Sequence, residues 1–290
     1  MVNTHRGNNQ VKPLAVTTNI YQMTAPQLVS IALLPAQRRE RIVQFLQRHG
    51  AVTLQQLAQA LEASVSTLRR DLDGLEAEGV LDRTHGGAIL RQQQYGTFEP
   101  DAAAAAELSP REKRAIGVAA AAALLPGQSV LFDSGSTVLE AARAALERRL
   151  PLVAVTNDLA IAQLLGSSAQ VRVHVLGGPL RPHSNTMLGE PVLRGLAALQ
   201  ADVVLLGAHA VTGEVLSETD PEVAAVKRAF LSAARSRRLL VDSSKFRPRA
   251  FMQFGAAGEL QQLITDTGLS DEQAEPLRRA GLVVDRIHVA

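Results

Sequence analysis

Cysteine is absent from the 290-residue chain, which excludes a disulfide framework and any metal site built from thiolates. The seven histidines are scattered, and no two of them have the spacing of metal ligands. No apolar run is long enough to cross a bilayer, and we recognise no signal peptide, so we expect a cytoplasmic protein without a metal or a cofactor. The formal net charge is only +2, which allows local basic patches but indicates nucleic-acid binding only weakly.

One stretch near residue 70 combines an apolar stripe with a polar face. The apolar residues that recur at the helical period are Val65, Leu68, Leu72 and Leu75. The opposite face carries Ser66, Thr67, Arg70 and Asp73, with Arg69 at its edge. We expect a helix over 64–78 with Ser64 as its N-cap. Hydroxyls and arginines suit contacts with DNA, although an ordinary surface helix explains this stretch alone at least as well.

The neighbouring segments favour the DNA-binding interpretation. Residues 53–56 have the sequence of a capping box and begin a short helix that ends only about two residues before Ser64. An earlier helix is expected to begin near Ala36. Residues 79–83 and 88–90 predict a small hairpin, so that three helices and a wing form a winged helix-turn-helix.

The spaced residues of this region closely resemble DeoR-type bacterial transcription regulators over residues 36–91. The matching run is Leu68-Arg69-Arg70-Asp71-Leu72, then Leu75-Glu76, Gly79 and Arg83-Thr84-His85-Gly86-Gly87-Ala88. One departure is Ala63, where the family usually has valine. The resemblance implies that the residues at or near DNA are Ser64, Ser66, Thr67, Arg69 and Arg70 on the helix and Arg83 and His85 on the wing. Arginines of the first helix (Arg38, Arg39, Arg41 and Arg48) fit a solvated face as well as phosphate contacts.

Four segments divide the chain. Residues 1–34 show no clear periodicity before Leu28 and receive no function: they are a disordered arm or, if Met23 is the true start, an over-long reading frame. We assign 35–91 to the winged domain, 92–108 to a glutamine- and alanine-rich linker, and 109–290 to a second domain.

The second domain begins with Ser109-Pro110-Arg111-Glu112, a cap, proline and glutamate pattern that predicts a helix up to Leu125. Strands are then expected at 129–132, 152–155, 171–176, 203–206, 239–241 and 263–265. Helices are expected at 138–148, 159–165, 191–199, 221–235 and from 270 to just before 281. The alternation implies a doubly wound parallel sheet, in which ligands bind at the carboxyl ends of the strands.

Polar residues follow several of these strands. Asp133-Ser134-Gly135-Ser136-Thr137 is a small, hydroxyl-rich turn before a helix, which suits an anion, although a tight turn without a ligand explains it equally well. The other strand ends are Thr156-Asn157, Gly177-Gly178, Gly207-Ala208 and Asp242-Ser243-Ser244-Lys245. Several polar ends at one edge fit a phosphorylated ligand better than five unrelated turns do.

Residues 110–288 resemble the effector domain of the DeoR family, which shares its fold with ribose-5-phosphate isomerases. The implied effector-binding residues are Asp133, Ser134, Gly135, Ser136 and Thr137 as a phosphate loop, with Thr156, Asn157, Gly177, Gly178, Asp242 and Lys245 around the sugar phosphate. Ser136 stands where the family often has threonine. Glu222 and Lys227 also match the family, but a surface ion pair on a helix explains them at least as well.

An isomerase on the same scaffold is the alternative function. Isomerisation needs a positioned carboxylate, and the isomerases have an Asp-Gly-Ala-Asp-Glu segment. The corresponding residues here would be 206–210, which place Leu206, His209 and Ala210 at the acidic positions. We therefore expect no enzyme. An interaction module without a ligand would leave the polar strand ends unexplained.

The expected protein is a repressor of sugar-metabolism genes. It would bind a double-stranded DNA operator as a homodimer or tetramer and respond to a phosphorylated sugar. The expected fold is an N-terminal all-α winged helix-turn-helix with a small β wing, followed by a C-terminal α/β doubly wound parallel-sheet domain of the ribose-5-phosphate-isomerase-like kind.

Overall fold

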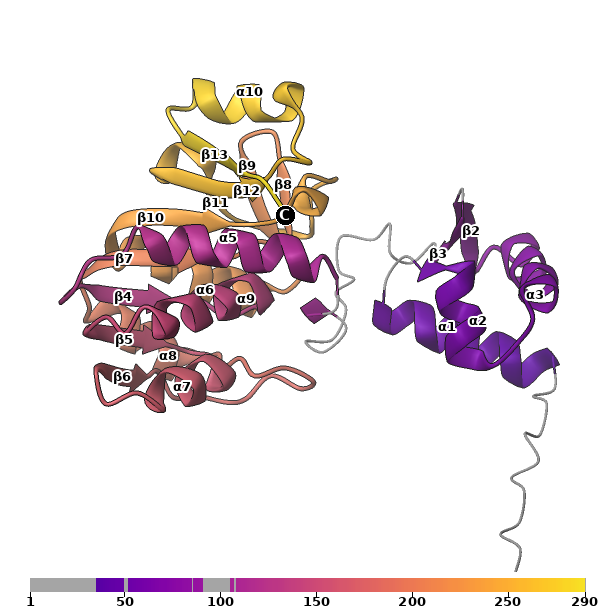
Figure 1. Ribbon diagram of the computed structural model, residues 1–290, viewed down its shortest axis with the longest axis horizontal. Coiled ribbons are helices and arrows are strands. Elements are labelled where there is room, and N and C mark those ends of the chain that lie inside the picture. The colour runs from indigo at the N-terminus through magenta and orange to yellow at the C-terminus, as the bar shows by residue number, and fades with distance from the viewer. Residues whose placement is uncertain (1–34, 50–51, 85, 91–104, 107, 290) are drawn as a thin grey trace, which may run out of the picture. The chain divides into compact units, whose positions relative to one another are not determined.

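The computed structural model describes residues 35–49, 52–84, 86–90, 105–106 and 108–289. Two domains are formed by these residues, a small winged domain and a larger α/β domain (Figure 1). The extension over 1–34 and most of the expected linker lie outside them, so the boundaries of those segments stay predictions. In the described part of the chain, no helix is both long enough and apolar enough to span a membrane.

The winged domain has three helices and a three-stranded sheet. Its elements are α1 (Pro35–His49), β1 (Val52–Thr53), α2 (Leu54–Leu61), α3 (Val65–Ala77), β2 (Leu81–Thr84) and β3 (Gly87–Leu90). The strands pair antiparallel in the order β1-β3-β2. This confirms the three helices and the hairpin, while the two-residue strand β1 is too short to leave a periodic signal in the sequence.

Local caps fix the helix-turn-helix. Thr53 caps α2 in a capping box: its Oγ1 accepts from the amide of Gln56 at 3.2 Å, and the Gln56 side chain accepts from the Thr53 amide at 2.8 Å. Ser64 caps α3 by accepting from the amide of Thr67 at 3.2 Å. The prediction that Val65 lies on the apolar stripe of this helix was wrong. Val65 lies in the first turn of α3, is 37% exposed and does not belong to the apolar core cluster of this domain.

The α/β domain is built on one parallel sheet of seven strands. They are β4 (Ser129–Phe132), β5 (Leu152–Thr156), β6 (Val171–Val175), β7 (Ala201–Leu206), β10 (Ala234–Leu240), β12 (Gln262–Asp266) and β13 (Val283–Ile287). Their spatial order is β13-β12-β10-β7-β4-β5-β6. From β4 the chain moves outward through β5 and β6 and then returns to β7 on the other side of β4. The topological switch point therefore lies between β4 and β7.

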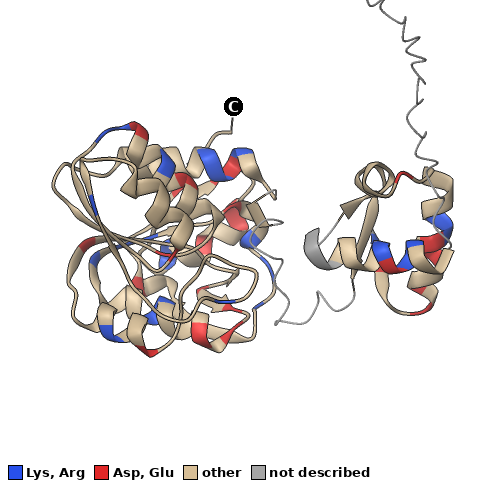
Figure 2. Cartoon of the chain, turned by 90° about the horizontal axis from the view of Figure 1, so that it is seen from below, with Lys and Arg blue, Asp and Glu red and all other residues tan. Residues whose placement is uncertain are grey.

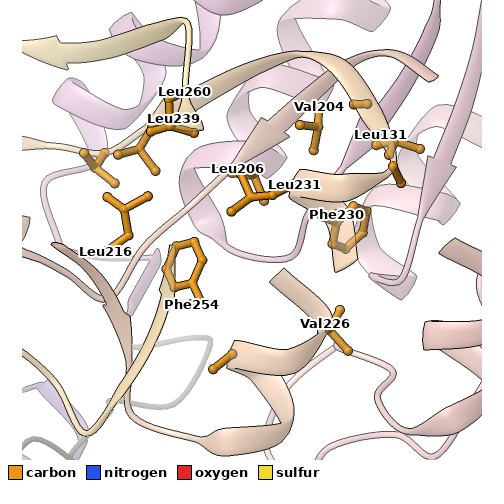
Figure 3. Packing of buried hydrophobic residues seen from close by; sticks show 14 of the residues in the cluster. Leu131, Val204, Leu206, Leu216, Val226, Phe230, Leu231, Leu239, Phe254 and Leu260 are labelled. Carbon is orange, nitrogen blue, oxygen red and sulfur yellow. The ribbon is translucent and has the colours of Figure 1, made fainter. Parts of the chain in front are cut away.

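Helices cover both faces of the sheet, as Figure 1 shows. One face packs against α5 (Pro110–Ala122), α6 (Ser136–Glu147) and α7 (Leu159–Gly166), and the other against α8 (Glu190–Ala197), α9 (Pro221–Ser232) and α10 (Asp271–Arg279). Successive strand residues alternate between the faces. In β7, Val203 and Leu205 belong to the core under α5–α7, while Val204 and Leu206 belong to the opposite core, part of which Figure 3 shows. Burial on both faces explains the continuous apolar runs.

A second, antiparallel sheet was not expected from the sequence. Its strands are β8 (Ala210–Thr212), β9 (Val215–Glu218) and β11 (Met252–Ala256), in the order β11-β9-β8. The edge strand β13 was missed as well. These strands are short and polar residues or glycine interrupt them, so they form neither a continuous apolar run nor a clear alternation, and only pairing in the tertiary structure reveals them.

Two expected helix ends and one expected capping hydrogen bond were wrong. α9 does not reach Arg235: it ends at Ser232, and Ala234 begins β10 because it pairs with Ala201 of β7. α5 ends at Ala122, before Leu125. Ser109 occupies the N-cap position of α5, but its backbone is left-handed (φ 49°) and its hydroxyl makes no capping hydrogen bond.

Candidate functional site

The outward face of α3 carries the hydroxyls and arginines expected from the sequence. Ser64, Ser66, Arg69 and Arg70 are exposed, and Thr67 is half-buried. The Ser64 hydroxyl oxygen lies 3.0 Å from that of Ser66 and 2.8 Å from that of Thr67. The first turn of α3 thus presents a hydroxyl cluster, followed by two guanidinium groups, which is a suitable surface for base edges and phosphates. Their contacts with DNA stay predictions.

Two arginines of α1 bind α3. The Asp71 side chain is 5% exposed and accepts from Arg38, with Nε at 2.5 Å and Nη2 at 3.3 Å. Arg39 lies 3.8 Å from Asp71 and 2.9 Å from Glu78. Arg38, whose side chain is 14% exposed, thus does not belong to a solvated face and instead fixes α3 against α1. Arg39 is 37% exposed and does face solvent, and phosphate contacts by these arginines stay predictions. Basic and acidic segments accordingly lie next to one another on the helices of this domain (Figure 2).

The wing is tied to the same helix. Arg83 of β2 donates from Nη1 to Asp73 at 2.6 Å, and its backbone amide donates to the Glu76 carboxylate at 3.1 Å. Arg83 therefore positions the wing on α3, and its proposed contact with DNA would compete with Asp73. His85, the other expected wing residue, lies outside the described residues.

A buried ionic network occupies the switch point of the sheet. Asp133, at the end of β4, accepts from the Gly207 amide at 3.0 Å and from the Lys227 ammonium. Lys227 also donates to the Gly207 carbonyl at 3.0 Å and lies 3.5 Å from Glu218. The expected surface pair of Lys227 with Glu222 was wrong: Lys227 is 4% exposed and faces the sheet, while Glu222 is exposed.

The loop after β4 lines a pocket at the carboxyl edge of the sheet. Ser134, Gly135, Ser136 and Thr137 line it, and so does Lys245, from the short 3₁₀ helix η2 (Ser243–Lys245) after β10. Gly135 has φ 119°, which favours glycine, and it provides no side-chain cap for α6. The first amides of α6 therefore face the pocket side of the loop without a side-chain acceptor, which is the arrangement that binds anions.

Two of the expected effector residues support the end of β5 from within the fold. Thr156 and Asn157 are fully buried. The Thr156 hydroxyl accepts from the amide of Asp158 at 3.0 Å, and the Asn157 side chain donates to the carbonyl of Met187 at 2.9 Å. They shape the floor of the site and are not among the side chains that line the pocket.

Asp242 is placed in a similar way. It is 1% exposed and accepts from the amide of Ser244 at 3.0 Å, which shapes the turn that carries Lys245.

Gly177 and Gly178 also lie outside the pocket lining. Gly178 is required for packing, because a Cβ there would lie 2.3 Å from the carbonyl oxygen of Leu188.

Several pocket residues were missed. They are Asp158 at the end of β5, Arg181, His183, Ser184 and Asn185 in the loop before α8, and Glu218 at the end of β9. The 181–186 loop has no periodicity that could have placed it there. Asp158 had a detectable signal as the N-cap of α7, where its Oδ1 accepts from the amides of Ala160 and Ile161 at 2.9 and 3.1 Å.

His209, at the end of β7, also lines the pocket. Burial, together with the positive charges of Arg247, Lys245, Lys227 and Arg181, lowers its pKa to about 2. The imidazole is therefore neutral at physiological pH in strongly cationic surroundings. On the opposite side, burial raises the pKa of Asp158. No group of three or more His, Asp or Glu side chains in the described ranges could hold a metal ion.

The fold and these two sites define a class of protein, a DNA-binding regulator with a separate ligand-sensing domain. Residues 38–94 match the DeoR-like helix-turn-helix domain, and residues 109–267 match the DeoR C terminal sensor domain. The chain belongs to the DeoR family of transcriptional regulators. The resemblance found in the sequence is thereby confirmed.

Relatives of similar length support this assignment. The HTH-type transcriptional regulator GlpR of Haloferax volcanii is 31% identical over 87% of this chain and 98% of its own length. The glycerol-3-phosphate regulon repressor of Escherichia coli (strain K12) is 30% identical over 79% and 90%. The lactose phosphotransferase system repressor of Lactococcus lactis is 29% identical over 82% and 93%. The chain is accordingly a regulator and not an isomerase.

Solved structures resemble the fold more remotely. Ribose 5 phosphate isomerase A from Neisseria gonorrhoeae aligns with a TM-score of 0.36 and 16% identity over 47% of this chain and 53% of that chain. The delta subunit of eIF2B from Chaetomium thermophilum aligns with a TM-score of 0.42 and 13% identity over 79% and 70%. The chain thus spans about half the length of the isomerase.

Proposed function

We propose that this regulator represses genes of sugar metabolism and releases its operator when a phosphorylated sugar binds in the α/β domain. The observation that supports this most is the pocket at the switch point, where a hydroxyl-rich loop at the start of α6 and a group of cations lie together. Such surroundings favour a phosphate, whose negative charge complements both.

Within the pocket, the phosphate would contact the backbone and hydroxyls of residues 134–137 and the ammonium of Lys245. Asp133, Thr156, Asn157 and Asp242 would act by holding the strand ends in place, because all four are buried and engaged with the backbone. Of the two glycines in the sequence prediction, Gly178 would have an indirect role through its packing against Leu188, and no contact supports a role for Gly177.

On the DNA side, α3 would enter the major groove. Ser64, Ser66, Thr67, Arg69 and Arg70 would face bases and phosphates, and the wing would contact the backbone of the duplex. A single winged domain offers a small interface, so tight operator binding calls for a homodimer or a tetramer. A ligand that prefers one arrangement of the oligomer would then shift the DNA-binding equilibrium.

The test uses the full chain and a DNA fragment that it selects from genomic DNA. A panel of sugar phosphates is screened for ligands that raise the melting temperature and lower the affinity for this fragment. Lys245→Ala should retain DNA binding and lose most of the ligand response. Arg249→Ala, which removes an exposed cation from the same loop, should respond as the natural chain does. A panel without effect, or an unchanged response of Lys245→Ala, would contradict the proposal.

A further inference from the structure

The charged residues of the pocket differ between its two ends along the carboxyl edge of the sheet. The end of β7 carries His209, whose surroundings contain the positive charges of Arg247, Lys245, Lys227 and Arg181. The end of β5 carries Asp158 instead, an acid that is 7% exposed and lines the same pocket. β4, with the proposed phosphate loop, lies between these two strands. A ligand at this edge therefore meets several cations on one side, together with Glu218, which lies 3.5 Å from Lys227, and on the other side Asp158, which lies next to the amide of Gly135.

The carboxylate of Asp158 is held in place. Its Oδ1 accepts from the amides of Ala160 and Ile161 at 2.9 and 3.1 Å, as the N-cap of α7. The group would have to uncap this helix in order to swing away from a ligand. Asp158 is thus an acceptor in a fixed position.

The loop that begins at Arg181 reproduces the same polarity. Thr186 forms a β-bridge with Asp158, and the carbonyl of Asn185 accepts from the first amide of α7 at 2.9 Å, so this part of the loop lies on the acidic side. Its side chains there are uncharged. At the other end of the loop, the guanidinium of Arg181 lies 3.7 Å from Asp220, the N-cap of α9, and adds to the positive charge around His209.

We propose, on the basis of the phosphate site proposed above, that Asp158 makes this regulator selective for sugars with one phosphate and a free hydroxyl end. The phosphate lies toward β4 and β7, and the hydroxyls extend toward β5, where the carboxylate accepts their hydrogen bonds. Neighbouring strands lie ~5 Å apart, so a sugar of five or six carbons reaches from the loop to Asp158. A second phosphate at the far end would meet the carboxylate and be repelled.

The experiment compares each monophosphate with the bisphosphate of the same sugar. Glucose 6-phosphate is paired with glucose 1,6-bisphosphate, and ribose 5-phosphate with ribose 1,5-bisphosphate, on the full-length chain. Dissociation constants come from calorimetry or from the concentration dependence of the melting temperature. The variant is Asp158→Asn, because asparagine keeps the N-cap while removing the charge. Asp202→Asn is the matched control: it removes one negative charge at the amino ends of β4 and β7, the opposite edge of the sheet.

The natural chain should bind the monophosphate of at least one pair more tightly than its bisphosphate. Asp158→Asn should reduce this preference at least tenfold, which corresponds to 1.4 kcal/mol, and Asp202→Asn should leave it unchanged. If in every pair that binds the bisphosphate binds as tightly as its monophosphate, or if Asp158→Asn leaves the ratio unchanged, the selectivity role is overturned while the phosphate site stands. If neither pair nor the wider panel binds, both proposals are overturned.

Discussion

The buried network around Lys227 offers a direct test of how the effector domain is held together. Lys227→Met keeps the length of the side chain but removes the cation that contacts both Asp133 and Glu218. The side chains of these three residues are only 5%, 1% and 4% exposed, so water replaces the lost partner poorly, although Glu218 lines the pocket. Removing one partner of a buried pair costs ~3–5 kcal/mol, because the remaining charge stays buried and uncompensated.

We expect the upper part of that range, since two carboxylates lose their partner. For a domain of this size, each kcal/mol lowers the melting temperature by roughly 2–4 °C, so the α/β domain should melt about 10–20 °C earlier. Urea unfolding followed by circular dichroism measures the free energy of the same transition. Adding Asp133→Asn to the Lys227→Met variant should recover part of the loss, because one of the two unpaired charges is removed.

The control is Arg228→Met, the next residue on α9, which is exposed and should change stability by no more than ~1 kcal/mol, because it loses one solvent-exposed hydrogen bond to the carbonyl of Gln253. A loss below about 1 kcal/mol for Lys227→Met would refute the reasoning, because it would show that the carboxylates are solvated or paired in another way. The same conclusion would follow if Asp133→Asn made the variant still less stable.

Three further predictions concern the other sites. Arg70→Ala should weaken operator binding by ~1–3 kcal/mol if Arg70 reads a base. Arg70→Lys should recover only the non-specific part of the binding free energy. If the natural chain and both variants bind equally in an anisotropy titration, Arg70 does not belong to the interface. Arg38→Met should destabilise the winged domain by about 3 kcal/mol in urea, since Asp71 stays buried and keeps only the longer 3.8 Å contact with Arg39; an unchanged midpoint would show that the Arg38–Asp71 pair is not stabilising. His209 binds a proton less readily in the folded than in the unfolded chain, because its pKa is lowered from 6.5 to about 2. Its contribution should therefore lower the free energy of unfolding as pH falls from 6.5 toward 2, and His209→Asn should reduce that slope; an identical pH dependence in both proteins would contradict the burial argument.

The sequence alone determined the winged domain almost completely. Its helices are marked by caps that act within three or four residues, such as the hydroxyls of Thr53 and Ser64, and by apolar residues at the helical period. The central strands of the parallel sheet were predictable for a similar reason, since burial on both faces selects short, continuous apolar runs. These signals are local, so they survive in the one-dimensional chain.

The partners of the polar residues were decided by the tertiary structure. Lys227 and Asp133 are 94 residues apart in sequence and meet only because α9 packs under the ends of β4 and β7. Asp158, Arg181 and His209 converge on the pocket in the same way, from three separate loops. A charged residue has the same identity whether it is solvated or buried against a partner. The folded arrangement of the strands brings distant loops to one edge of the sheet, and it alone determines whether a charged residue is solvated or buried against a partner.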